Sequence, residues 1–364
     1  MLLNRYLCAL VILPALLVPV AAHADPLYTA NFFLTTNIFT PTDMNNAGQI
    51  VGIDGGISLR AIFYDGIKRD LSISDAEASL GFGINDAGAI TGVYLSRTDS
   101  DSHAFVYQNG AVRDLGAGTA GYGINATGAV VGAIRTAGGN TGFIEQNGVL
   151  TQLGNLGAGL ESQALAVNDL GQVVGDSTLN AAADDATRHP FLYSNGVLHD
   201  LGTLGNGVNN SAVAINNAGQ VAGYSDAADG TTHAFLYDDG VMRDLGGFGT
   251  HQMIINNLNA FGRLVGTAVT GASGDTPFML LGDTLVDLNT LLDPALGWQL
   301  YDAYTINDLD QIIASGCHDH VCGLVRLDLA GAIPEPGFIW LLAPGLLLLT
   351  VARRRASVNF ARVP

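Results

Sequence analysis

The sequence predicts an all-β protein: a seven-bladed β-propeller of four-stranded antiparallel blades, with an N-terminal signal helix and a C-terminal transmembrane helix outside the fold. Three observations lead to this prediction. A hairpin motif recurs seven times, at a period typical of propellers and solenoids. Each repeat has room for four short strands. The last repeat lacks one strand, and a strand-like run with no partner precedes the first repeat.

The repeated motif is an aliphatic residue, Asn, two variable residues and Gly, followed by x-aliphatic-x-Gly. Five regular copies have their asparagine at Asn45, Asn85, Asn125, Asn168 and Asn216. Two further copies are expected to be degenerate: Asn256 is followed by a three-residue insertion before Gly262, and Asn307 is followed by Asp310 where the glycine belongs. The Asn-to-Asn spacings are then 40, 40, 43, 48, 40 and 51.

Asn at the first position and Gly at the fourth suit a type I turn in which the glycine is left-handed. Such a turn joins two strands in a tight hairpin. In the fifth repeat the expected strands are Ser211–Asn216, Gln220–Ser225, His233–Tyr237 and Val241–Leu245. Residues 25–333 contain no sustained helical periodicity. The repeat is therefore expected to be a small four-stranded sheet, as in a propeller blade.

The two ends of the repeat region predict how the ring closes. The seventh repeat has expected strands near Asp302–Ile306, Gln311–Gly316 and Gly323–Leu329, one fewer than the others. The strand-like run Leu27–Thr35 has no place in the first repeat. Pairing this run with the last blade removes both free sheet edges. A solenoid, the second choice, would need caps instead. We therefore predict a closed propeller over residues 25–332.

Both ends of the chain carry targeting features. Residues 1–24 have a cationic start, an apolar run and a small-x-small ending, so we expect signal peptidase to cut between Ala24 and Asp25. The alternative is an uncleaved N-terminal anchor. Residues 333–355 combine Pro334, Glu335 and Pro336 with an apolar run and the cluster Arg353, Arg354 and Arg355. Sixteen apolar residues span about 24 Å, so a short transmembrane helix is expected, with residues 356–364 as a cytoplasmic tail.

The part between the two targeting segments is strongly acidic. Residues 25–333 contain 10 Lys and Arg against 32 Asp and Glu, a net charge of −22. Such a charge repels nucleic acid and anionic lipid, so nucleic-acid binding is excluded as a function class. Two cysteines, Cys317 and Cys322, remain after signal cleavage and are expected to form a disulfide, as is common outside the cytoplasm.

A second pattern lies on the third and fourth strands of the repeat. It reads His103-Ala104-Phe105 with Arg113-Asp114-Leu115-Gly116, and it recurs around His189 and His233. Together with the Asn-x-x-Gly hairpins, it resembles the bacterial HAF-type extracellular repeat. Repeats one, three and six depart from it by lacking the histidine. The resemblance implies an extracellular repeat protein with no agreed biochemical activity.

The C-terminal segment resembles a PEP-CTERM sorting signal, although nine residues follow its arginine cluster. This resemblance implies processing by an exosortase and a Gram-negative host that makes exopolysaccharide. It also implies a route by which the protein is delivered to the cell surface. The protein would be anchored in the membrane, facing the periplasm or cell surface, and then released to the surface or the extracellular matrix.

Candidate chemistry is sparse. In a propeller His103, His189 and His233 would lie on different blades, so we expect hydrogen bonds to neighbouring strands and no shared metal ion. His318 and His320 leave a surface metal site open as the alternative to the disulfide. Glu145 is an unusual acid within a strand, but one carboxylate gives weak support for glycoside hydrolysis. We therefore expect no catalytic residues and no resident metal.

Acidic pairs in turns leave weak calcium binding open. They are Asp99/Asp101, Asp184/Asp185, Asp226/Asp229 and Asp238/Asp239. The spacing of an EF-hand loop is absent. The sequence thus predicts an exported, non-catalytic propeller that binds exopolysaccharide or envelope components. The alternatives are a calcium-stabilised coat protein and a secreted carbohydrate-active enzyme.

Overall fold

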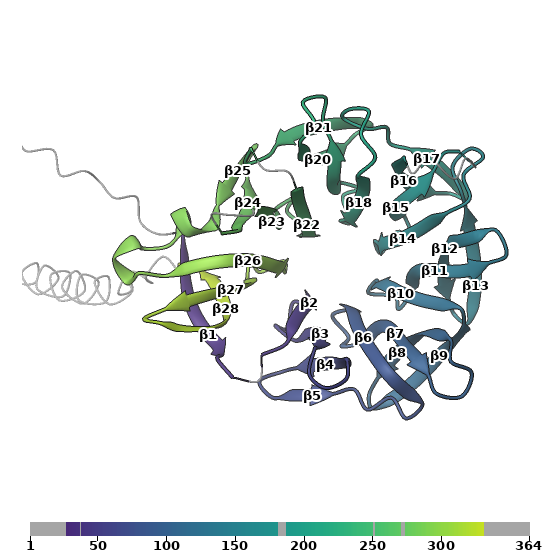
Figure 1. Ribbon diagram of the computed structural model, residues 1–364, viewed down its shortest axis with the longest axis horizontal. Coiled ribbons are helices and arrows are strands. Elements are labelled where there is room, and N and C mark those ends of the chain that lie inside the picture. Colours follow the sequence, from purple (N-terminus) through teal and green to yellow (C-terminus); the bar gives the residue numbers. More distant parts are fainter. Residues whose placement is uncertain (1–26, 37, 181–186, 250–251, 271–273, 331–364) are drawn as a thin grey trace, which may run out of the picture.

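The computed structural model describes residues 27–36, 38–180, 187–249, 252–270 and 274–330. These residues form seven four-stranded sheets arranged as blades around one axis, which confirms the predicted seven-bladed propeller (Figure 1). In each blade the first strand of the repeat lies nearest the axis. The predicted signal segment 1–24, the sorting segment 333–355 and the tail 356–364 lie outside the described residues.

Blades 1 to 6 each consist of four consecutive antiparallel strands, ordered from the axis outward. Blade 1 is β2 (Thr40–Met44), β3 (Ile50–Asp54), β4 (Arg60–Tyr64) and β5 (Lys68–Asp70), and blade 2 is β6 (Ala76–Ile84), β7 (Ile90–Ser96), β8 (Ser102–Gln108) and β9 (Ala111–Ala117). Blade 3 is β10 (Thr119–Ile124), β11 (Val130–Thr136), β12 (Gly139–Gln146) and β13 (Val149–Gly154), and blade 4 is β14 (Ser162–Val167), β15 (Val173–Thr178), β16 (Arg188–Ser194) and β17 (Val197–Asp200). Blade 5 is β18 (Asn210–Ile215), β19 (Val221–Asp226), β20 (Thr232–Asp238) and β21 (Val241–Gly246), and blade 6 is β22 (Gln252–Leu258), β23 (Leu264–Val269), β24 (Thr276–Leu281) and β25 (Thr284–Asp287).

Blade 7 is assembled from both ends of the fold. It contains β26 (Gln299–Ile306), β27 (Ile312–His318) and β28 (Val321–Leu329), and β1 (Tyr28–Leu34) pairs with β28 as the outermost strand. Two short 3-10 helices, Leu288–Leu291 and Pro294–Leu296, precede this blade. The predicted closure of the ring by the N-terminal strand is therefore confirmed.

In blades 2 to 6 the motif glycine on the second strand makes room for an aromatic ring. In the registers of blades 2 to 6 this glycine lies directly opposite the phenylalanine of the third strand, as Gly223 lies opposite Phe235. A Cβ at Gly223 would lie 2.0 Å from the Ser211 carbonyl oxygen and 2.6 Å from Phe235 Cζ. All five phenylalanine rings are completely buried. Blade 7 pairs Ala314 with the smaller Val325, so the combined volume is roughly conserved.

The structure corrects the alignment of the sixth repeat. The turn residue is Asn259, not Asn256: the main-chain N–H of Asn259 donates to Arg263 O at 3.0 Å, and Gly262 N–H donates to Asn259 O at 3.1 Å. The copy Leu258–Gly262 is therefore regular and carries no insertion. Asn256 and Asn257 lie at the end of β22, where the strand bulges.

The seventh repeat does replace glycine by aspartate, as expected, and the structure shows how the fold tolerates it. Asp310 adopts the left-handed conformation, with φ 57°. Its carboxylate accepts a 2.8 Å hydrogen bond from Asn259 Nδ2 and forms a 2.8 Å ion pair with Arg263 Nη1. These contacts to blade 6 offset the cost of a left-handed residue with a side chain.

Cys317 and Cys322 are opposite each other on β27 and β28, and the structure has them joined by a disulfide. The neighbouring His318 stacks on Trp298, with ring centroids 4.8 Å apart. Within the described residues, no helix has the length and apolar character needed to cross a membrane.

Deleting residues 27–35 tests the closure. Tyr28 is buried in the blade 7 core and Phe32 packs on Trp298, so losing both side chains is expected to lower the free energy of unfolding by at least about 3 kcal/mol. The exposed edge of β28 is also expected to promote self-association. Urea unfolding and light scattering measure both effects, with deletion of residues 356–364 as the control. An unchanged unfolding midpoint in a monomeric protein would contradict this account of the closure.

Candidate functional site

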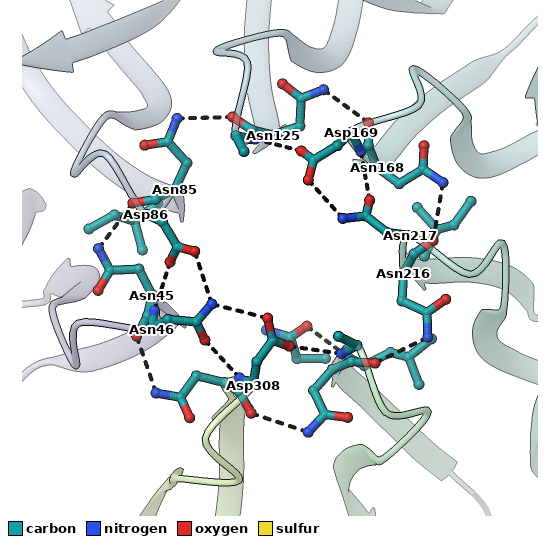
Figure 2. A pocket seen from close by; sticks show the side chains of 18 of the residues that line it. Asn45, Asn46, Asn85, Asp86, Asn125, Asn168, Asp169, Asn216, Asn217 and Asp308 are labelled. Atoms are coloured by element: carbon teal, nitrogen blue, oxygen red, sulfur yellow. Dashed lines mark hydrogen bonds between the residues drawn. The ribbon is translucent and has the colours of Figure 1, made fainter.

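The seven motif asparagines form a closed ring of hydrogen bonds around the propeller axis. Each side-chain Nδ2 donates to the main-chain carbonyl of the equivalent asparagine in the next blade, at 2.9–3.2 Å (Figure 2). The last link runs from Asn307 to Asn45 and joins blade 7 to blade 1. All seven residues are buried. The hairpin motif is thus the joint between blades as well as a turn within each blade.

Each of these side chains uses both ends of its carboxamide. The Oδ1 atom of Asn85, for example, accepts from Ala87 N–H at 3.1 Å and Ala89 N–H at 2.9 Å within its own turn, while Nδ2 donates to Asn125 O. Aspartate would supply the acceptor without the donor, and serine could not reach across to the next blade. Asparagine therefore meets both demands in a buried position.

A second layer of polar residues surrounds the opening of the ring on the solvent side. Here Asp86, Asp169 and Asp308 accept main-chain N–H bonds from the preceding blades at 2.8 Å, and Asn46 and Asn217 donate to these carboxylates. These residues and the asparagine ring line a cavity of about 220 Å³, which we call the mouth. Figure 2 shows the carboxylates and carboxamides around it.

Below the mouth lies a cavity of about 360 Å³, which we call the chamber. The two cavities share Ile124, Val167, Ile215 and Asn257 as lining residues, so they are contiguous along the axis. Every innermost strand is bulged at this depth: the register against the second strand skips one residue, three positions before the motif asparagine. Bulges re-aim side chains, and in most blades the skipped residue lines the chamber.

The chamber has two different walls. Blades 2 to 5 form an apolar wall of four bulge residues, Phe82, Tyr122, Leu165 and Val213. The rings of Phe82 and Tyr122 meet edge to face, with centroids 5.7 Å apart.

Blades 1 and 6 form the opposite, polar wall. Its residues are Thr42, Asp43, Asn256 and Asn257. The residues that line this cavity therefore differ in chemistry between blades 2 to 5 and blades 1 and 6.

Asp43 is the carboxylate of the chamber and connects four blades. Its Oδ1 accepts from Met44 N–H at 2.8 Å and Asn257 Nδ2 at 3.1 Å, with a weaker 3.4 Å contact to Thr305 Oγ1, and its Oδ2 accepts from Ile84 N–H at 3.0 Å. Burial within the ring raises the pKa of Asp43 to about 6, although these hydrogen bonds oppose the shift. Because this pKa lies below 7, the charged form of Asp43 predominates at neutral pH.

The histidines singled out in the sequence have the structural role expected of them. His103, His189 and His233 each hold their Nδ1 atom 2.9–3.0 Å from an aspartate of the fourth strand, eleven residues later. That aspartate in turn accepts the N–H of the glycine two residues further on. The His-Ala-Phe and Arg-Asp-Leu-Gly patterns are thus the two halves of one contact between the outer strands.

Three of the remaining candidates, Glu145, Asp99 and Asp101, make structural contacts. Glu145 is buried, pairs with Arg113 of blade 2 at 2.9 Å and accepts the Gly148 N–H. Asp99 contacts His103, and Asp101 pairs with Arg135. Asp184 and Asp185 lie outside the described residues. Across the described ranges, no three His, Cys, Asp or Glu side chains come together in a way that could hold a metal ion.

Sequence reasoning missed the chamber residues. They stand two and three positions before the motif asparagine, where four repeats have a bulky apolar residue followed by Gly or Ala, and two have Thr42-Asp43 and Asn256-Asn257. The sequence contains this loss of repeat symmetry. In the sixth repeat it becomes apparent only when the motif is aligned on Asn259, three residues after Asn256.

Replacing Asn125 by alanine tests the asparagine ring. The substitution leaves buried N–H and C=O groups of blades 3 and 4 without partners, and each costs about 1–3 kcal/mol, so the free energy of unfolding is expected to fall by at least about 2 kcal/mol. Asn140→Ala, an exposed asparagine of the same blade, is the control and should change it by less than about 0.5 kcal/mol. If Asn125→Ala and Asn140→Ala change the free energy of unfolding equally in urea titrations, the asparagine ring does not stabilise the fold.

Asp43 gives the fold a predictable pH dependence. Its folded-state pKa lies above the unfolded value, so its contribution to stability is full below about pH 4 and is lost as the pH rises through about 6. Relative to Asp43→Asn, the free energy of unfolding of the wild type should fall by on the order of 1–2 kcal/mol between pH 4 and pH 7. This figure is reduced to allow for screening by solvent in the channel. Unfolding of both proteins across this range measures it. A constant difference would show that Asp43 does not titrate there.

Comparison with known proteins supports the fold and no closer relationship. Neither a family model nor a curated protein matches the chain. It is similar in structure to the β-propeller domain of the Trilobed protease from Pyrococcus furiosus, with TM-score 0.53 and 9% identity over 82% of this chain and 100% of that one. A Mycobacterium tuberculosis puromycin-hydrolyzing peptidase has TM-score 0.50 and 12% identity over 84% of this chain and 55% of its own.

A further similar structure is the Pyrococcus horikoshii acylaminoacyl peptidase, with TM-score 0.50 and 11% identity over 77% of this chain. The chain spans about half the length of these two peptidases, 55% and 49%. At such identities the likeness establishes the propeller fold alone.

Proposed function

We propose that the protein is an exported, non-catalytic propeller that binds exopolysaccharide or another envelope component at the cell surface or in the biofilm matrix. The observation that carries the proposal is the chamber: a cavity with one apolar and one polar wall, held on a frame of seven mutually bonded blades. Cavities of about 300–1,000 Å³ with mostly apolar walls and a few fixed polar groups are typical of small-ligand sites.

Export follows from the two ends of the chain. In this proposal signal peptidase releases the chain at Asp25, and an exosortase recognises Pro334, Glu335, Pro336 and the cluster Arg353–Arg355. The disulfide between Cys317 and Cys322 supports an oxidising location, because such bonds persist outside the cytoplasm. The membrane is reached through the C-terminal segment, and the propeller faces outward.

The charge of the propeller limits its partners. A net charge of −22 over residues 25–333 repels acidic polymers at low and physiological ionic strength. A polysaccharide partner is therefore expected to be neutral or cationic at the contact.

One observation favours a second candidate, a carbohydrate-active enzyme. Asp43 lies in a cavity and has a raised pKa, as general acids often do. Glycoside hydrolysis usually employs two carboxylates a few ångströms apart, and Asp43 is the one acid among the described residues that line the chamber. Binding without turnover is therefore the function that the geometry supports better.

A pull-down of the purified propeller with the host's own extracellular polysaccharide tests the proposal. We expect the polymer to be retained and its chain length to stay unchanged during prolonged incubation. A heat-unfolded sample of the same protein serves as the control for non-specific adsorption. Failure to bind any envelope fraction would contradict the binding function, and shortening of the polymer would support the enzyme instead.

A further inference from the structure

The lining of the axial channel narrows the class of ligand. The mouth contains Asp86, Asp169 and Asp308, and the chamber contains Asp43. Among the described residues that line the two cavities, none is Lys, Arg or His. The negative potential of the axis is thus not neutralised locally, and a cavity with walls of low dielectric constant strengthens it. A ligand with a positive charge gains from this field, and an acidic one is excluded.

The apolar wall indicates that the cation is part of an organic molecule. Phe82 and Tyr122 present ring surface to the chamber beside Leu165 and Val213. Aromatic faces attract ammonium groups and also pack against the C–H face of a saccharide ring. A hydrated divalent ion would gain nothing from the apolar wall, and Asp43 is the one carboxylate among the described residues that line the chamber.

The polar wall can receive one ammonium or several hydroxyl groups. Within the described residues, Asp43 Oδ2 accepts a single hydrogen bond, from Ile84 N–H, whereas each carboxylate oxygen has room for about two. Asn256 uses its Nδ2 to donate to Ala303 O at 2.7 Å, which fixes the orientation of its carboxamide. These groups are held by main-chain contacts, so the site is preorganised.

We infer that the chamber binds a saccharide unit bearing an ammonium group, an amino sugar, entering along the axis with its amine toward Asp43 and its ring against Phe82 and Tyr122. This inference rests on the proposed function and names the ligand class for it. It accounts for a strongly acidic protein that associates with a polysaccharide: the contact is to cationic units of the polymer.

The test is isothermal titration of the whole propeller at pH 7 with glucosamine, N-acetylglucosamine and glucose. Acetylation removes the charge and keeps the ring, so glucosamine should bind at least tenfold more tightly than the other two. Asp43→Asn should weaken the affinity for glucosamine at least tenfold. Val213→Phe narrows the chamber without touching the Asp43 contacts, and it should also weaken glucosamine binding. This second variant keeps the test decisive if Asp43→Asn proves unstable.

The control variant is Asp239→Asn, an exposed acid in an outer turn of blade 5, which should leave binding unchanged. Equal affinity for glucosamine and N-acetylglucosamine would overturn the inference, as would full glucosamine binding by the chamber variants. If the polymer is still retained by Asp43→Asn and Val213→Phe, the inference fails and the proposed function stands. If neither the polymer nor any of the three sugars binds, both fail.

Discussion

The structure depends on one repeated hydrogen bond, from the carboxamide of a buried asparagine to the main-chain carbonyl of its counterpart in the next blade. Seven such bonds form a cycle, so no blade can tilt without breaking two of them. The same side chains fix the hairpins through Oδ1. The same asparagines therefore fix the turn within each blade and the contact between blades. They also hold the residues that line the mouth and the chamber in place.

Packing within each blade follows a second constraint, the match between a small residue on the second strand and a larger partner opposite it on the third. Blades 2 to 6 oppose glycine with phenylalanine, blade 1 opposes Gly52 with Ile62, and blade 7 opposes Ala314 with Val325. In blades 1 to 6 a Cβ at this glycine would lie 1.8–2.3 Å from a main-chain carbonyl oxygen of the first strand, so a side chain there would collide with the backbone. The residues that line the chamber, in contrast, are apolar in blades 2 to 5 and polar in blades 1 and 6.

Much of this fold could be predicted from the sequence because its signals are local. The turn chemistry, the four strands and the unpaired run at the N-terminus each lie within one repeat or one end. The asparagine ring could not be predicted, since six of its links join residues 40 to 48 apart, the seventh joins residues 262 apart, and all depend on how the blades stack. The chamber could not be predicted either, because its lining residues come from several blades. In the sixth repeat the neighbouring Asn256 and Asn257 match the first part of the motif, and the hydrogen bonds of the turn show that Asn259 is the turn residue.

A binding protein gains from such a frame, because a rigid cavity loses little entropy on taking up its ligand. The claim that the asparagine cycle holds all seven blades as one unit is tested most directly by native-state hydrogen exchange of the seven turn amides two residues after each ring asparagine. The account predicts one common free energy of exchange, equal to that of global unfolding. Faster, independent exchange in individual blades, above all in blades 1 and 7, would contradict it.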